Sequence, residues 1–502
     1  MKLTTVVLAV VVCAAPWVRS LSAAWAAESG GMGGRVYADN QVGSDDFNGQ
    51  AARPVGDGKT GPCATISAAL RKVPTGGLVS VANTGKDYRE AVRVANLKKG
   101  RPGHPLVLEG NGAAVSGLVT VPAALWTLLR DGVYWFEDQG PDRPPHQGGM
   151  PSSNWLAHNR HQGWFTERQA PEIFFLNGRA APHVRELAAI PEAGFFYDTQ
   201  ASPRRLYFRE PAGVKLEACT IDIPLNPGVF VDDDYVVVRN LLSRYSHDDG
   251  FAGFWGIGVV FENCNGSFNC DQGISLHGTS TTIIDGGLFE RNGGCGIADV
   301  MSSITVYRNV VVRDNMIAGA WLAGLAHSFL SCRFSGNCGP QVTGAPETAL
   351  NLTNCLLVGN PADGAAVGVS MDSGRLNHCT LAAFTTGVAL KRPAAITNCI
   401  LASCGQDLLR ISSELPPNAE LHKNVFQLGR ITLAKDAVTA ANWKELSAKL
   451  PWLSQNFAGT LTLDPPLYAL PGDSPYAKSA DYGTAPGAKL PPWTEWKVLN
   501  TD

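Results

Sequence analysis

Short apolar runs separated by small polar residues dominate the middle of the chain. β-Branched and other apolar residues form the runs 235–238, 281–284, 304–306 and 310–312. Each run is too short for a helix and stands at a fixed offset from a turn signal, which is typical of strands. The pattern therefore predicts many short strands, joined by tight turns, between Ser246 and Asp407.

Two columns of polar residues set the period of these strands. In the first column a small polar residue precedes a glycine, or in one case a glutamine, by four positions: Ser246, Asn269, Asn292, Asn315, Asn337 and Asn360. The steps between these positions are 23, 23, 23, 22 and 23 residues. The second column runs in phase and contains Asn240, Asn263, Asp285, Asn309, Ser331, Asn354, His378 and Asn398. A repeat of roughly 23 residues that holds three short strands predicts an all-β fold, the right-handed parallel β-helix.

Successive coils of such a solenoid lie about 4.8 Å apart, so residues one period apart stack on one another. We interpret the first column mainly as a structural ladder, because asparagine tolerates left-handed turns and stacked amides can bond along the solenoid. Five cysteines follow the second column directly: Cys264, Cys332, Cys355, Cys379 and Cys399. They either fill the core as reduced thiols, the interpretation we favour, or pair as disulfides between coils.

The segment from residue 36 to 117 carries a resemblance to a known superfamily. It contains Val-Tyr at 36–37, GSDDFNG at 43–49, GPCATI at 61–66 and HPLVLEG at 104–110. These motifs resemble the opening of pectate-lyase-like β-helix proteins, in which a short helix caps the open end of the solenoid. A cap is physically required, because the first coil would otherwise expose unpaired strand edges and an apolar stack.

The coil rhythm is absent from about residue 123 to 226, where tryptophans and prolines cluster. Strand-like runs at 173–178, 195–198 and 206–208 predict a small antiparallel unit, which resembles the β-sandwich inserts of some β-helix glycosidases. Its aromatic residues either form its own core, which we favour, or lie exposed and stack on sugars.

The C-terminal segment resembles the end of the same proteins. Closing strands are expected at 463–467, 473–475 and 483–488, with a short helix at 440–450 between coils and closing strands. The expected organisation is a leader at 1–26, a cap with first coils at 27–122, the insert at 123–226, coils at 227–412 and a closing segment at 413–502.

Composition changes this picture mainly at the N-terminus. Lys2, an apolar run at 6–15 and the small residues that flank Trp25 form a signal peptide pattern, and the run is too short to span a membrane. This pattern predicts a secreted, periplasmic or cell-surface protein. The net charge of −3, without a basic block, argues against nucleic-acid binding, and no later segment is apolar enough to span a bilayer.

One turn departs from the uncharged composition of the others. His247, Asp248 and Asp249 are followed 23 residues after Asp248 by Asp271 (271 − 248), so two carboxylates should stack on neighbouring coils. Retaining glycosidases hold two carboxyl groups about 5–5.5 Å apart, which is close to the coil spacing. Repulsion between such neighbours raises one pKa, as a general acid requires.

Three interpretations of these acids stay open. They hydrolyse a glycosidic bond, or they hold Ca²⁺ for a lyase or epimerase reaction, or they only bond turn amides. Arg244 and Arg291 are candidate bases and substrate-binding residues, and His277 is expected to point outward into the same cleft. Asp299 falls in an inward column, where a buried carboxylate is costly unless paired, so we expect a local bend there.

The sequence therefore predicts a polysaccharide-active enzyme, a glycosidase or lyase, with His247, Asp248, Asp249 and Asp271 as catalytic residues. No cofactor follows from the sequence itself, although Ca²⁺ is one that these acids can hold. The rival hypothesis is a non-catalytic extracellular module that binds carbohydrate, or another surface, along the solenoid. One fold hosts many reactions, so the fold alone does not decide between them.

Overall fold

The computed structural model describes residues 34–490, apart from several gaps. These gaps are 138–173, 199–200, 202–204, 360–366, 373, 393–394, 414–419, 428, 435, 440–441, 450 and 464–467. The predicted leader at 1–26 therefore lies outside the described residues. Within the described part of the chain, no helix has the length and apolar character needed to cross a membrane.

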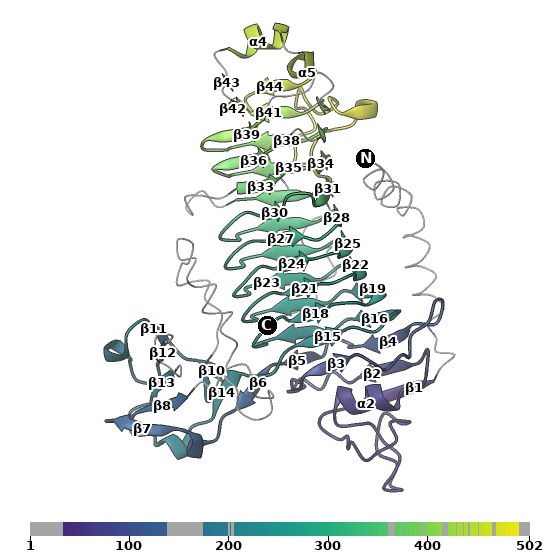
Figure 1. The fold of residues 1–502 in the computed structure, drawn as a ribbon, viewed down its shortest axis with the longest axis vertical. Helices are drawn as coiled ribbons and strands as arrows, with labels where there is room; N and C mark the ends of the chain where they lie inside the picture. The colour runs from purple at the N-terminus through teal and green to yellow at the C-terminus, as the bar shows by residue number, and fades with distance from the viewer. Residues whose placement is uncertain are drawn as a thin grey trace.

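Three long sheets, here called sheets A, B and C, wind about one axis to form a solenoid (Figure 1). Sheet A contains β1 (Arg35–Ala38), β2 (Leu78–Val81), β4 (Leu106–Glu109), β16 (Val236–Arg239), β19 (Ile257–Glu262), β22 (Thr281–Asp285), β25 (Ile304–Arg308), β28 (Ala326–Leu330), β31 (Ala349–Thr353), β34 (Gly374–Asn377), β37 (Ala395–Thr397) and β40 (Leu421–His422). Sheet B contains β5 (Ala114–Ser116), β17 (Leu242–Arg244), β20 (Asn265–Ser267), β23 (Leu288–Glu290), β26 (Val311–Arg313), β29 (Arg333–Ser335), β32 (Leu356–Val358), β35 (Thr380–Ala382), β38 (Ile400–Ala402), β41 (Val425–Gln427) and β44 (Phe457–Gly459). Sheet C contains β3 (Val92–Val94), β15 (Val229–Val231), β18 (Phe251–Gly253), β21 (Ile274–Leu276), β24 (Ile297–Val300), β27 (Ala320–Ala323), β30 (Val342–Gly344), β33 (Val367–Met371), β36 (Thr386–Leu390), β39 (Asp407–Ile411), β42 (Ile431–Leu433) and β43 (Asp436–Val438).

Strand pairing in these sheets is parallel, and each strand pairs with its counterpart one coil away. Thus β18 pairs with β21 and β21 pairs with β24, in register. The exception among the described strands is the antiparallel pair β42–β43 at the end of sheet C. The predicted fold class, a parallel β-helix, is confirmed.

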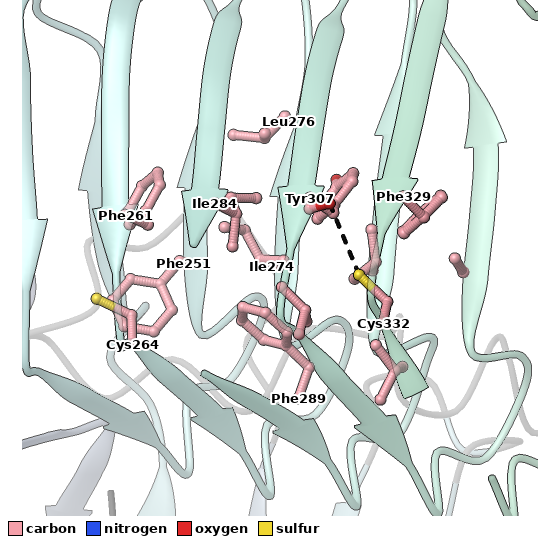
Figure 2. Close-up of a cluster of buried hydrophobic side chains, with 14 of the residues drawn as sticks. Phe251, Phe261, Cys264, Ile274, Leu276, Ile284, Phe289, Tyr307, Phe329 and Cys332 are labelled. Carbon is pink, nitrogen blue, oxygen red and sulfur yellow. Dashed lines mark hydrogen bonds between the residues drawn. The ribbon is translucent and has the colours of Figure 1, made fainter. Parts of the chain in front are cut away.

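Inward side chains of the three sheets fill the interior of the solenoid, as Figure 2 shows for its central coils. Phe251, Ile274 and Ile297 stack in register along sheet C, and each is fully buried. Phe261 of sheet A and Phe289 of sheet B close the same layers from the other two sides. Burial of these columns provides the main driving force for stacking the coils.

The first polar column forms the predicted ladder. Backbone N–H groups of Ser246 and Asn269 each donate to the side-chain Oδ1 of the asparagine one coil later, at 3.0 Å in both cases. The amide Nδ2 of Asn269 also donates to Asn292 Oδ1 at 2.9 Å, and Asn292 repeats this contact with Asn315. These side chains are fully buried, so the ladder satisfies turn groups that water cannot reach.

The left-handed backbone occurs in the second polar column, not in the first as we expected. Asn240, Asn263 and Asn309 have φ angles of 52°, 51° and 54°. Their side chains link coils as well, since Asn263 Nδ2 donates to Asn240 Oδ1 at 2.9 Å. The two columns thus divide the roles that we had assigned to one.

A short helix, α2 (Ile66–Lys72), covers the open end of the first coil (Figure 1). Thr65 caps the helix by accepting the N–H of Ala68 at 3.0 Å. Ile66 and Leu70 are buried in the same apolar cluster as the solenoid interior. The helix therefore shields the first layer of the core, as a cap must.

The insert consists of two small sheets beside the first coils (Figure 1). One contains β6 (Leu118–Thr120), β14 (Ile221–Pro224), β9 (Phe175–Leu176) and β10 (Arg179–Ala180), and the other contains β7 (Thr127–Arg130), β8 (Val133–Glu137), β13 (Arg205–Arg209), β12 (Phe195–Asp198) and β11 (His183–Val184). All of their pairings are antiparallel except β11–β12. Trp126, Phe136, Phe174 and Phe208 contact one another in its core, so these aromatic residues are structural.

One short helix, α4 (Trp443–Lys449), lies within the segment 440–450 where a helix was expected, and a second, α5 (Pro451–Ser454), follows it. The closing strands expected at 473–475 and 483–488 are wrong, since neither segment forms a strand. The second of these segments follows a single 3-10 turn at Asp481–Gly483 and runs over sheet B. There the N–H of Ala488 donates to Thr380 Oγ1 at 2.9 Å, so a strand side chain takes the place of a backbone ladder.

The buried carboxyl group of Asp299 has specific neighbours inside the solenoid. Asp299 lies in the unbroken strand β24 with no exposed surface, so the local bend expected there is wrong. Its Oδ2 accepts a hydrogen bond from Tyr307 Oη at 2.7 Å and lies 3.1 Å from His327 Nδ1. The hydrogen bond from Tyr307 compensates part of the cost of burying the carboxyl group, whose Oδ1 has no hydrogen-bond partner among the described residues. The cysteines of the described residues are all free thiols, and the thiol of Cys355 bonds to those of Cys332 and Cys379.

Candidate functional site

Two stacked turns between sheets B and C carry the acidic residues. Ser246 Oγ accepts the N–H of Asp248 at 3.2 Å, which fixes the first turn. The N–H of Asp271, on the next coil, donates to the backbone oxygen of Asp248 at 3.2 Å. The predicted stacking of Asp248 on Asp271 is therefore present in the backbone, and the N–H of Gln272 bonds to Asp249 Oδ1 at 3.1 Å.

The three carboxylates converge on one point. One oxygen from each of Asp248, Asp249 and Asp271 lies within 4.8 Å of the others. Asp248 and Asp249 are half-buried, and Asp271 is 7% exposed. This set of hard oxygen donors is suited to a divalent cation such as Ca²⁺, and the same spacing is suited to two-carboxylate hydrolysis.

Gly294, in the turn of the following coil, leaves room for the Asp271 carboxylate. A Cβ atom at this position would lie 2.4 Å from Asp271 Oδ1 and 2.6 Å from Gln272 Oε1. Both separations are far below a van der Waals contact, so any larger residue at 294 displaces one or both side chains. The absence of a side chain at Gly294 therefore allows the Asp271 carboxylate to take its place in the acid cluster.

Asp249 differs electrostatically from its neighbours. Burial and the adjacent carboxylates of Asp248 and Asp271 hold the pKa of Asp249 well above its usual range. Hydrogen bonds from the Gln272 amide and the Ser275 hydroxyl oppose this shift without cancelling it. The protonated form of one carboxyl group is thus favoured while that group lies beside two others, which is the division that acid catalysis requires.

A pocket of about 280 Å³ opens beside the acids over the outer surface of sheet C. Its floor is a column of small residues in register, Ala252, Ser275 and Ala298. The same column continues to Phe230 on one side and to Trp321 on the other. The floor is therefore three coils long and ends in an aromatic side chain at each end.

His277 lines this pocket, as predicted. Its Nε2 lies 2.8 Å from Ser275 Oγ, and its ring stacks on Phe254 with centroids 4.4 Å apart. Ser275 also bonds to Asp249, so the hydroxyl connects the histidine to the raised carboxyl group. Burial lowers the pKa of His277, which keeps the imidazole neutral at pH 7.

Three of the predicted site residues, His247, Arg244 and Arg291, do not line the pocket. The N–H of His247 donates to the backbone oxygen of Asn226 at 3.1 Å, and burial lowers the pKa of this histidine to about 4. Arg244 pairs with Asp87, with Nη2 2.9 Å from Oδ1. Arg291 is exposed and its guanidinium lies 5.4 Å from the centroid of the Phe268 ring. The acids and His277 are thus brought together, whereas His247 and both arginines lie elsewhere.

Sequence reasoning missed the aromatic residues and the serine of the pocket. Phe230, Ala252, Ser275, Ala298 and Trp321 are spaced by 22 or 23 residues, so the repeat places them in one column. The repeat alone does not indicate which face of the column points outward. The acid cluster, three or four residues before the column on the same coils, was the available signal.

Known proteins resemble this chain in fold. The family described as right handed beta helix region matches residues 206–360. The structure described as the complex of XylC with xylose is 12% identical, with a TM-score of 0.53, over 85% of this chain and 82% of that chain. Pectate lyase Pel9A is 13% identical, with a TM-score of 0.47, over 92% of this chain and 98% of that chain. No curated protein matches the chain in sequence. The sheet topology and the matched region identify the chain as a right-handed parallel β-helix protein.

Proposed function

We propose that this chain is an exported carbohydrate-active enzyme that hydrolyses glycosidic bonds with retention of configuration. The observation that carries the proposal is the cluster of Asp248, Asp249 and Asp271, whose oxygens lie within 4.8 Å of one another. Retaining enzymes use carboxyl groups about 5–5.5 Å apart, whereas inverting enzymes need about 6.5–9.5 Å for an intervening water. The short separation therefore favours retention.

The raised pKa of Asp249 supports the following catalytic roles. Asp249 is the general acid that protonates the glycosidic oxygen, while the Asp271 carboxylate attacks the anomeric carbon and the alcohol leaves. In the second step the Asp249 carboxylate takes a proton from water. The water oxygen then attacks the anomeric carbon and releases Asp271, which restores both groups. Asp248 contributes by its charge, which keeps Asp249 protonated.

The pocket lining favours hydrolysis over elimination. Elimination by the lysine or arginine base that we expected of a lyase is not supported, because the described residues that line the pocket include neither; the neutral imidazole of His277 is the other base there. Arg244, one of the two candidate bases, is held in its ion pair with Asp87. The leader pattern at 1–26 supports export, and a structure of similar fold contains xylose.

The test is hydrolysis of a panel of polysaccharides and aryl glycosides by the full chain. Asp249→Asn and Asp271→Asn are expected to lower kcat/KM by about 10²–10⁴-fold. Asp314→Asn is the matched control, because this acid lies in a later turn outside the pocket, and less than a twofold change is expected there. NMR of the first product should show the anomeric configuration of the substrate.

Each contrary result identifies a different function. Unsaturated products that form only with Ca²⁺ would establish elimination and overturn the hydrolytic proposal. Sugar binding without turnover by the unmodified chain would establish the non-catalytic alternative. Hydrolysis that persists in both pocket variants would leave the bond cleavage but remove the site assignment.

A further inference from the structure

The pocket beside the acids offers charges of one sign. Among its described lining residues, Asp248, Asp249 and Asp271 are the only ionisable side chains besides His277, which burial keeps neutral. A carboxylate on a ligand would therefore meet acidic groups within a few ångströms and no cation among the described lining residues; the guanidinium of Arg93 lies outside this lining, on the ring of Phe230. Like charges at such distances repel strongly where water is partly excluded. The lining thus selects against acidic sugars.

The ends of the pocket are aromatic and its middle is small. Phe230 and Trp321 belong to one outward column, separated by the three small floor residues. Four strand spacings of about 4.8 Å place the two aromatic positions roughly 19 Å apart along the solenoid. The volume of about 280 Å³ is near the lower limit for ligand pockets, which corresponds to one or two sugar rings.

The two aromatic ends differ in how they are covered. The guanidinium of Arg93 lies 4.5 Å from the centroid of the Phe230 ring, and Phe254 lies 5.7 Å from the same ring. Trp321 is 46% exposed, and within the described part of the chain neither another ring nor a cation stacks on it. A large indole face is therefore available at the pocket, and the apolar C–H face of a pyranose is a group that such a surface binds.

We infer that the pocket binds an uncharged mono- or disaccharide unit, with one sugar ring packed on Trp321 and the acids at its side. The inference rests on the proposed function only in that the ligand is a carbohydrate. Hydroxyl groups of a neutral sugar can donate to the carboxylates of Asp248 and Asp271, whereas the carboxylate of a uronate finds no cation among the described lining residues to pair with its charge. The neutral charge of the ligand and its contact with Trp321 are separate, testable claims.

The experiment measures binding, so it does not depend on turnover. Isothermal titration calorimetry at pH 7 would use the unmodified chain and paired, hydrolysis-resistant aryl thioglycosides that differ only at C6, the β-glucoside with the β-glucuronide and the β-galactoside with the β-galacturonide. The corresponding aryl thioglycosides of xylose, mannose and arabinose complete the neutral set. We expect at least one neutral glycoside to bind about tenfold or more tightly than the uronide with which it is paired. If the neutral glycoside that binds has no paired uronide, it should bind about tenfold or more tightly than both uronides.

A second variant tests the platform. Trp321→Ala in the same background should weaken binding of the neutral glycoside about tenfold. Trp255→Ala is the matched control, since Trp255 is 55% exposed and lies outside the pocket lining, and it should change affinity less than twofold.

The outcomes separate this inference from the proposed enzyme. Binding of neutral sugars that depends on Trp321, in a chain that hydrolyses nothing, would remove the proposed function and support the inference. Uronides that bind as tightly as their neutral partners, with or without Ca²⁺, would overturn it. Equal effects of the two tryptophan variants, or no binding by any neutral glycoside, would also overturn it.

Discussion

The substitution Gly294→Ala tests whether the position of the Asp271 carboxylate matters. A Cβ atom at 294 would lie 2.4 Å from Asp271 Oδ1, whereas an ordinary contact is about 3.4 Å or longer, so the carboxylate must move by about 1 Å. Misplacement of a reacting group by about 1 Å costs on the order of 10²-fold in rate. We therefore expect kcat/KM to fall by about 10²-fold.

The fold should tolerate this substitution. The two nearest atoms belong to the ends of the Asp271 and Gln272 side chains, which can rotate, so the free energy of unfolding should fall by only about 1–3 kcal/mol. Gly472→Ala is the control, because no atom lies within 4 Å of a Cβ atom there and its activity should be unchanged. The assay is initial-rate hydrolysis of the best glycoside, together with a urea melt of each variant. A Gly294→Ala enzyme of normal stability and normal activity would refute the role of Asp271.

Three further predictions concern pH, the ladder and the thiols. Asp249 acts in its protonated form and the charge of Asp248 raises its pKa, so Asp248→Asn should shift the alkaline limb of the kcat/KM–pH profile to lower pH; an unmoved limb would contradict the assignment. Asn292 is fully buried and accepts two hydrogen bonds from Asn269. Asn292→Ala should therefore lower the free energy of unfolding, measured in urea, by about 2–4 kcal/mol. Asn309→Ala, at an exposed position of the second column, should lower this free energy by less. Burial raises the pKa of Cys264 to about 12, so this thiol and the stack around Cys355 should resist a thiol reagent in the folded chain and react after unfolding; a reagent-resistant unfolded chain would indicate disulfides instead.

The solenoid was predictable because its physical signals repeat. A buried turn amide needs a partner at every coil, so Asn269, Asn292 and Asn315 recur at a constant step and reveal the register. The register then predicted that Asp248 would stack on Asp271, and the backbone contact between them has this arrangement. Local rules were sufficient wherever a residue contacts its own counterpart on the next coil.

Prediction failed where a residue contacts something other than its own counterpart on the next coil. His247 lies in the acidic turn, yet its backbone bonds to Asn226 at the end of the insert, and the sequence does not indicate where the insert packs. Arg244 was expected near the acids but pairs with Asp87 in the first coils. The buried Asp299 was misjudged for the same reason, because Tyr307 and His327 come from later strands.

The floor of the pocket makes the length of the binding site a discrete quantity. Each coil adds one outward position to the column, and small residues at three successive positions leave the space between Phe230 and Trp321. Beyond Trp321 the column continues with Thr343. A single replacement of Trp321 by a small residue would therefore extend the site by one whole coil, about 4.8 Å, without any change of backbone. In this architecture, ligand length can change stepwise through point mutations, while the acids stay in place.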